Sequence, residues 1–277
     1  MRRTPQHTPG TTGVPGLILL LALFAAACSS VPITGRSQLS LIPASTMLAT
    51  SVQQYGEFLK SSTVSTDARK VALVRKVGTG IQGAVERYFR EKNMSDRLKD
   101  YQWEFNLVES EDVNAWCMPG GKVVVYTGIL PVTRDEAGLA VVMGHEIAHA
   151  IAEHGSERMS QELLTQLGGI GLAAALESEP QKTRDLWMSV YGAGATFGAL
   201  LPFSRLHESE ADRLGLIFMA MAGYNPQEAV TFWQRMAAQK GGQSPPEFLS
   251  THPSDETRIA DLQKLLPEAR TYYRKPS

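Results

Sequence analysis

Residues 145–149 read HEIAH, and residues 139–143 shortly before them read LAVVM. On an α-helix, side chains four positions apart leave the same face, so His145 and His149 can bind one metal ion. Glu146 follows the first of these ligands and lies close enough to accept a proton from a metal-activated water. The apolar residues before the motif indicate a buried helix. This stretch therefore predicts both a buried helix and two metal ligands.

A catalytic zinc site takes three protein ligands and keeps one position open. One pattern places a histidine six residues after the second ligand, where this chain has Gly155, which excludes that pattern. A carboxylate on a later helix is the other solution: Glu208 and Asp212 are four residues apart and share a face, whereas Glu210 points away. We expect Glu208 to bind the metal and Asp212 to accept a hydrogen bond from a ligand histidine. The alternative is a charged helix that faces solvent, which the upstream HEIAH motif makes less favoured.

These residues predict a zinc-dependent endopeptidase that holds a single zinc ion. Zinc lowers the pKa of a bound water toward about 7, so that Glu146 can take its proton and later return it to the leaving amine. A structural zinc site fits poorly, because such sites are usually closed by four Cys or His ligands and need no adjacent glutamate.

The first 27 residues have the pattern of a secretory signal peptide. Arg2 and Arg3 provide a positive start, and Leu17–Ala27 is an apolar run of 11 residues, too short to span a bilayer. The small residues before Cys28 resemble a bacterial lipobox, so we expect Cys28 to be acylated and to anchor the protein. Ser29 resembles the residue that directs lipoproteins to the periplasmic face of the outer membrane. Ordinary signal cleavage beside an incidental cysteine is the alternative.

The chain has 277 residues, with 27 Lys and Arg against 28 Asp and Glu. This balance produces no global field that attracts nucleic acid, so we expect no nucleic-acid partner. Residues 28–50 contain several Ser, Thr and Pro residues and predict a tether off the membrane. We expect residues 51–277 to form a single metallopeptidase domain without a disulfide, since only Cys117 remains if Cys28 is lipidated.

Hydrophobic periodicity predicts an α+β fold that is mostly helical. Apolar residues at helical spacing predict a helix over roughly 67–92, and after Asp135 the chain is helical almost to its end. Alternating residues predict three short strands, at 101–107, 113–118 and 122–127, and Pro119-Gly120-Gly121 predicts a hairpin turn.

Two stretches, 163–176 and 188–201, are rich in glycine and alanine. Each has about 14 residues and is shorter than the roughly 20 that a membrane span needs. We favour a helical hairpin whose small residues allow close packing. The alternative is a segment that touches the membrane or covers the active-site cleft.

The predicted strand at 113–118 can serve as a substrate-binding edge. Peptidases usually hold an extended substrate by pairing it with an exposed edge strand, which would place Asn114 and Ala115 beside the substrate. Gly120 and Gly121 would let the backbone pass close to the metal cleft. A plain hairpin on the domain surface is the alternative.

Four blocks of this sequence resemble metallopeptidase family forty-eight, which includes the CAAX prenyl proteases and the Oma-type mitochondrial quality-control proteases. The blocks, within about residues 105–260, are Asn114-Ala115 with Pro119-Gly120-Gly121, GHEIAHA at 144–150, Ser204-Arg205 with ESEAD at 208–212, and His252-Pro253 with Arg258. The match is nearest to the secreted, membrane-tethered bacterial branch. It implies a gluzincin-type enzyme that cleaves misfolded or membrane-associated proteins of the cell envelope.

The resemblance also implies roles for individual residues. It implies zinc at His145, His149 and Glu208, with Glu146 as the catalytic base and Asp212 behind a ligand. His252 would approach the metal, either replacing the water in a resting state or stabilising the oxyanion; a loop histidine without a role is the alternative.

Two further histidines receive no catalytic role from the sequence. His154 lies five residues after His149, off the ligand face, and is expected to be structural, and His207 is assigned nothing. The competing function is a chaperone-like binding protein of the envelope in which proteolysis is secondary.

Overall fold

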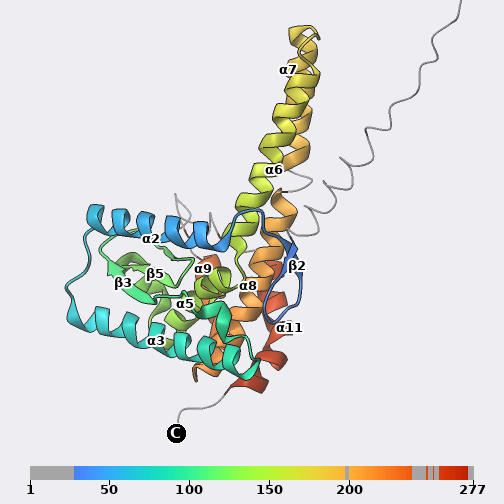
Figure 1. The fold of residues 1–277 in the computed structure, drawn as a ribbon. Helices are drawn as coiled ribbons and strands as arrows, with labels where there is room; N and C mark the ends of the chain where they lie inside the picture. Colours follow the sequence, from blue (N-terminus) through green and yellow to red (C-terminus); the bar gives the residue numbers. More distant parts are fainter. Residues whose placement is uncertain (1–27, 197–199, 239–247, 249–251, 253–255, 274–277) are drawn as a thin grey trace, which may run out of the picture.

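The computed structural model describes residues 28–196, 200–238, 248, 252 and 256–273, and Figure 1 shows their arrangement. The predicted signal peptide at 1–27 lies outside the described residues. The elements are β1 (Cys28–Ser30), β2 (Ser37–Leu39), α2 (Ala44–Ser61), α3 (Ala68–Glu91), β3 (Glu104–Val108), β4 (Ala115–Met118), β5 (Lys122–Tyr126), α4 (Leu130–Thr133), α5 (Glu136–Ile151), α6 (His154–Ala175), α7 (Gln181–Ala195), α8 (Leu201–Met221), α9 (Glu228–Ala238) and α11 (Glu256–Tyr272). The predicted α+β fold, mostly helical with a small sheet, is confirmed.

The sheet that lies beside α5 has the strand order β3-β5-β4. β3 runs parallel to β5, and β4 pairs antiparallel with β5 in a hairpin whose register joins Met118 to Lys122. The turn needs its two glycines, because Gly120 and Gly121 have φ angles of 84° and 82°. The predicted hairpin is confirmed, and β4 lies at one edge of this sheet.

Helix α5 runs through the centre of the molecule (Figure 1). The Asp135 side chain caps its N-terminus by accepting a hydrogen bond from the Gly138 amide at 2.9 Å. Every residue from Gly138 to Ala148 is buried, since α3, α8, α9 and β4 surround the helix. The prediction of a buried helix around the HEIAH motif is confirmed.

Two glycines let α5 and α8 approach closely. A Cβ atom on Gly144 would lie 3.0 Å from the carbonyl oxygen of Gly215, and a Cβ on Gly215 would lie 2.9 Å from the backbone nitrogen of His145. Such distances are shorter than normal packing allows, so any larger residue would push the two helices apart. This contact sets how near α8 comes to the HEIAH motif.

Helices α6 and α7 form a hairpin that projects from the rest of the fold (Figure 1). Tyr191 on α7 donates a hydrogen bond to the Thr165 carbonyl on α6 at 2.7 Å. Large apolar side chains on the hairpin face solvent, including Ile170 at 66% and Leu186 at 63% exposure. The favoured interpretation, a helical hairpin with small residues in its contact, agrees with this geometry. Within the part of the chain that the structure describes, no helix combines the length and apolar character needed to cross a membrane.

The segment predicted as a tether, residues 28–50, is structured instead. It contains the antiparallel pair β1–β2 and the first turns of α2. Arg36, in this segment, forms ion pairs with Glu157 and Glu210 at 2.7 and 2.8 Å. The correction has a physical reason: a buried carboxylate needs a partner charge, and these two partners lie more than a hundred residues along the chain.

Candidate active site

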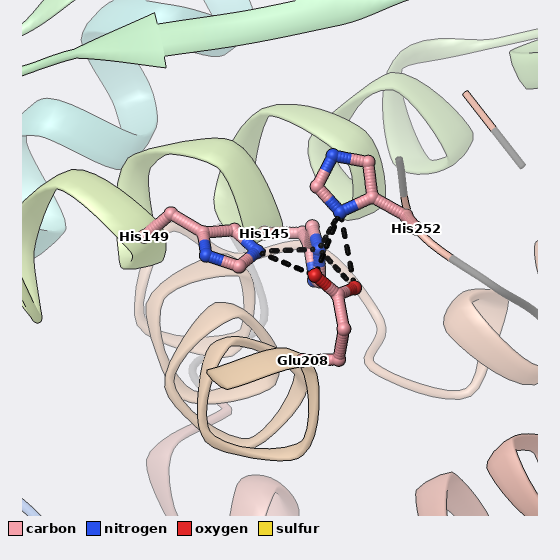
Figure 2. A group of neighbouring side chains, drawn as sticks. All are labelled: His145, His149, Glu208 and His252. Carbon is pink, nitrogen blue, oxygen red and sulfur yellow. Dashed lines mark hydrogen bonds and ion pairs between the residues drawn. The ribbon is translucent and has the colours of Figure 1, made fainter. Parts of the chain in front are cut away.

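Three histidines and one glutamate converge at the centre of the molecule, as Figure 2 shows. His145 and His149 come from α5, Glu208 comes from α8, and His252 precedes α11. His145 Nε2 lies 3.0 Å from His149 Nε2 and 3.2 Å from His252 Nδ1. His252 Nδ1 lies 3.0 Å from each carboxylate oxygen of Glu208. One donor atom from each residue falls within 4.8 Å of all the others.

The donor set fits a zinc ion. Imidazole nitrogens and a carboxylate oxygen are the ligands that catalytic zinc uses, and three such groups leave a fourth position. Ring nitrogens at 3.0 Å from each other repel unless a proton or a cation lies between them, so this spacing also fits a shared metal. The structure thus brings together all three predicted ligands and His252.

Asp212 and Arg258 support His145 from behind. His145 Nδ1 lies 3.0 Å from Asp212 Oδ1, so the ring can donate its Nδ1 proton and keep Nε2 for a metal. Arg258 donates two hydrogen bonds to the Asp212 carboxylate, at 2.7 and 2.9 Å, and its guanidinium lies 3.5 Å from the ring centroid of Trp233. Asp212 occupies the place that its predicted role requires.

Glu146 lies next to the cluster and is buried. Its Oε1 atom is 3.3 Å from His252 Nε2 but makes no hydrogen bond to any described residue. A buried carboxylate oxygen without a partner is costly unless a ligand or water pairs with it. Burial raises the pKa of Glu146, against the opposing effects of the nearby His252 and His145. A raised pKa suits a group that exchanges protons.

His154 is not among the grouped donors, but it contacts His149 on the side away from them, which the sequence did not predict. Its Nδ1 atom lies 2.9 Å from His149 Nδ1. The prediction assumed one continuous helix, but α5 ends at Ile151, and Glu153 takes a left-handed conformation with φ of 58°. This break turns the chain, so that the first residue of α6 faces back toward His149.

His207 and Glu210 are also buried beside this contact. His207 stacks on His154 with ring centroids 4.3 Å apart and lies 2.9 Å from Glu157 Oε2. Glu210 points away from the metal, as predicted, and lies 3.1 Å from His154 Nε2. Sequence reasoning missed these contacts because all of them join residues far apart in the chain.

The buried groups of the cluster shift one another's pKa values. Burial alone would lower the pKa of His145, but hydrogen bonds and charges from Asp212 and Glu208 raise it to about 9. Burial opposes ionisation of Glu208, yet the three histidines hold the pKa of its carboxyl well below the ordinary value. Burial lowers the pKa of His149. The two carboxylates that favour a proton on His145 also favour a divalent cation beside it.

A cleft of about 710 Å³ opens onto the cluster. One wall is the edge strand, with Asn114, Ala115, Trp116 and Cys117, and the metal side contributes Glu146, His149, Glu208 and His252. α2 provides apolar residues, among them Met47 and Leu48. The prediction that the edge strand lines this cleft agrees with the geometry.

Comparison with known proteins identifies a matching family and several similar proteins. The sequence profile of Peptidase family M48 matches residues 78–266, well over half of the chain. The mitochondrial metalloendopeptidase OMA1 of Schizosaccharomyces pombe is 39% identical over 174 residues, covering 62% of this chain and 49% of that protein. The human mitochondrial metalloendopeptidase OMA1 is 32% identical over 249 residues, covering 86% and 46%. The beta-barrel assembly-enhancing protease of Escherichia coli K12 is 31% identical over 173 residues, covering 61% and 35%. This chain spans about half or less of the length of these relatives.

Proposed function

This chain belongs to Peptidase family M48, and from that premise we propose that it is a zinc metalloendopeptidase of the bacterial cell envelope. His145, His149 and Glu208 would hold the zinc ion. When bound, zinc polarises a scissile carbonyl and lowers the pKa of water. The observation that carries the proposal is the convergence of these donors with His252 beside a buried carboxylate oxygen of Glu146 that accepts no hydrogen bond from the described residues.

Glu146 is the proposed general base and acid. Its carboxylate accepts a proton from the attacking water and passes that proton to the amine that leaves. Its burial and its raised pKa support both halves of this transfer. His252 has its Nδ1 atom at the donor cluster and its Nε2 atom 3.3 Å from Glu146 Oε1, which supports a role in holding the oxyanion of the tetrahedral intermediate or in occupying the open position in a resting state.

The edge strand β4 is the proposed substrate-binding element. One side of β4 pairs with β5, and its residues line the cleft that leads to the metal donors. A peptide that adds as a further strand would run past Asn114 and Ala115 toward Glu146. This mode requires an extended substrate, which favours unfolded or misfolded proteins.

Glu146→Gln tests the proposal. The variant removes the base but keeps a neutral side chain of the same shape, so we expect zinc content and thermal stability to remain and cleavage of an unfolded protein to fall by at least about 100-fold. Glu91→Gln is the matched control, because Glu91 is exposed at the end of α3 and should retain full activity. Normal cleavage by Glu146→Gln would exclude this mechanism.

We further propose that the protein is lipid-anchored through Cys28 on the periplasmic face of the outer membrane. The apolar run before Cys28 and the small residues next to it support this location. The similarity to a beta-barrel assembly-enhancing protease of Escherichia coli agrees with an envelope role. Cys28→Ala should abolish incorporation of a labelled fatty acid and release the protein from the membrane fraction. A membrane-bound, unlabelled wild-type chain would argue against lipidation.

A second candidate function is a chaperone-like protein that binds envelope proteins. The solvent-facing apolar side chains of the α6–α7 hairpin favour it. The two functions differ in one measurable way. If Glu146→Gln supports envelope integrity as fully as wild type in a deletion strain, binding is the main activity; if it fails, proteolysis is.

A further inference from the structure

The metal ligand His149 has a neighbour that the proposed mechanism does not use. We propose that His154 is a positioning residue for His149, and that Glu210 and Arg36 hold His154 in place. This inference rests on the proposed metal site, since it concerns how one of that site's ligands is oriented.

Hydrogen-bond geometry fixes the direction of donation along this chain of residues. His149 Nε2 faces the metal cluster, so a metal-binding His149 carries its proton on Nδ1. The nearest acceptor is His154 Nδ1, at 2.9 Å. His154 then carries its own proton on Nε2, which lies 3.1 Å from Glu210 Oε2, and a carboxylate can only accept. Each group has one consistent role: His149 donates to His154, and His154 donates to Glu210.

The far end of this chain is clamped by an arginine from the N-terminal segment. Arg36 donates from Nε to Glu210 Oε2 at 2.8 Å and from Nη1 and Nη2 to Glu157 at 3.0 and 2.7 Å. Thr34 also donates a hydrogen bond to Glu210. Glu210 therefore has its own donors from residues 34 and 36, and its carboxylate cannot rotate away from His154 without breaking them.

Burial makes the arrangement rigid. His154, Glu157 and Glu210 are between 2% and 6% exposed, so water has little access to replace a lost contact. The ring of His207 covers one face of His154, with 15° between the two planes. His154 thus has one orientation, and that orientation presents an acceptor to His149.

The key variant is His154→Ala. It leaves the Nδ1 proton of His149 without its acceptor, so we expect zinc affinity to fall by about 10- to 100-fold, the usual effect of losing a hydrogen-bond partner of a metal ligand. Affinity is measured by competition with a chromogenic chelator on the full chain. The melting temperature of the metal-free protein is measured in parallel, to separate loss of fold from loss of zinc.

Two replacements of similar size distinguish positioning from simple packing. The amide oxygen of Asn lies where Nδ1 of histidine lies, so His154→Asn should recover most of the zinc affinity. His154→Gln places its amide further out and should behave like His154→Ala. A purely structural role for His154 would make Asn and Gln equivalent, which would overturn the proposal.

Two further variants complete the test. His207→Phe removes a buried imidazole that does not touch His149 while keeping the stacked ring, and it should retain wild-type zinc affinity. Arg36→Met should weaken zinc binding less than His154→Ala, because Arg36 acts on His149 only through Glu210 and His154.

Glu208→Ala separates failure of this inference from failure of the proposed function. If Glu208→Ala loses zinc and His154→Ala binds it as wild type does, the positioning role is wrong and the metal site stands. If both variants bind zinc as wild type does, the metal site itself is wrong, and the positioning role falls with it.

Discussion

The helix pairs α5–α8 and α6–α7 both have small residues at their contacts, but the first pair is buried in the core and the second is exposed to solvent. In α5–α8, Gly144 and Gly215 bring the two backbones together inside the core. In α6–α7, Gly168 lies against the Tyr191 side chain, and the outer faces of both helices meet solvent. Small residues allow close approach in both pairs, but only the first pair is enclosed. Metal donors on two helices must meet at one point, which requires a fixed spacing between those helices. The donors lie on α5 and α8, the pair that is tightly packed in the core.

Removing the metal should produce the largest difference in behaviour between the α5–α8 pair and the α6–α7 pair. If zinc is supplied at about 1,000 times its dissociation constant, its binding stabilises the native state by about 4 kcal/mol, and a chelator removes that contribution. Hydrogen exchange should therefore accelerate at the amides of α5 and α8 and stay constant in the projecting part of α6–α7. Equal acceleration in both pairs would show that the hairpin depends on the metal site.

Replacing one glycine by alanine should destabilise the α5–α8 pair and stabilise the α6–α7 hairpin. Gly215→Ala places a Cβ 2.9 Å from the His145 nitrogen, and we expect it to destabilise the protein by about 1–3 kcal/mol in urea unfolding. Gly171→Ala is the matched control on α6, where nothing lies within 4 Å of the new Cβ. There we expect slower hydrogen exchange in the hairpin, since alanine favours a helix by up to about 1 kcal/mol over glycine. A harmless Gly215→Ala would mean that the α5–α8 spacing is adjustable.

The stability of the protein at low pH should show how much the ion pair of Glu157 contributes at the base of the α6–α7 hairpin. Burial opposes ionisation of Glu157, but hydrogen bonds from His207 and Arg36 lower its pKa to about 2. Because the folded pKa lies below the ordinary value, this carboxylate stabilises the protein above about pH 4.5 and loses that contribution as the pH falls toward 2. In metal-free protein, the stability difference between wild type and Glu157→Gln should shrink over that range. A difference that is constant with pH would exclude this ion pair as its source.

The smallest effect is expected on the outer face of the hairpin. Leu167 is 54% exposed, so Leu167→Ser should change the free energy of unfolding by no more than about 0.5 kcal/mol. Urea unfolding at two protein concentrations measures it. A loss well above this value, dependent on concentration, would indicate that a second copy of the chain covers this face.

The spacing of residues along a single helix was enough to predict the site residues that lie on that helix. The HEIAH spacing predicted His145 and His149, and the four-residue spacing of Glu208 and Asp212 predicted two carboxylates on one face. The helix predicted over 67–92 is observed at Ala68–Glu91, and the hairpin at 113–127 is observed with shorter strands. In each case, periodicity and turn chemistry act over a few residues.

The missed features depend on one local break in the backbone and on long-range contacts. His154 reaches His149 only because Glu153 adopts a left-handed conformation, which a non-glycine residue rarely does. Residues 28–50 resembled a tether because their composition is polar, whereas Arg36 pairs with carboxylates on α6 and α8. No short sequence window contains Arg36 together with Glu157 or Glu210, so composition could not reveal these ion pairs.

The edge strand β4 has a consequence for how targets would be chosen. A segment can pair with β4 only when its own backbone groups are free, and in a stable domain they are already bonded within that domain. Under the proposed function, a folded protein would therefore be cut at a rate proportional to the fraction of time its segment is locally open. Two targets with the same sequence at the cleaved bond would then have different lifetimes if their local unfolding free energies differ. Each difference of about 1.4 kcal/mol would change the lifetime roughly tenfold. The enzyme would then choose its substrates by their conformational stability, with little recognition of their side chains.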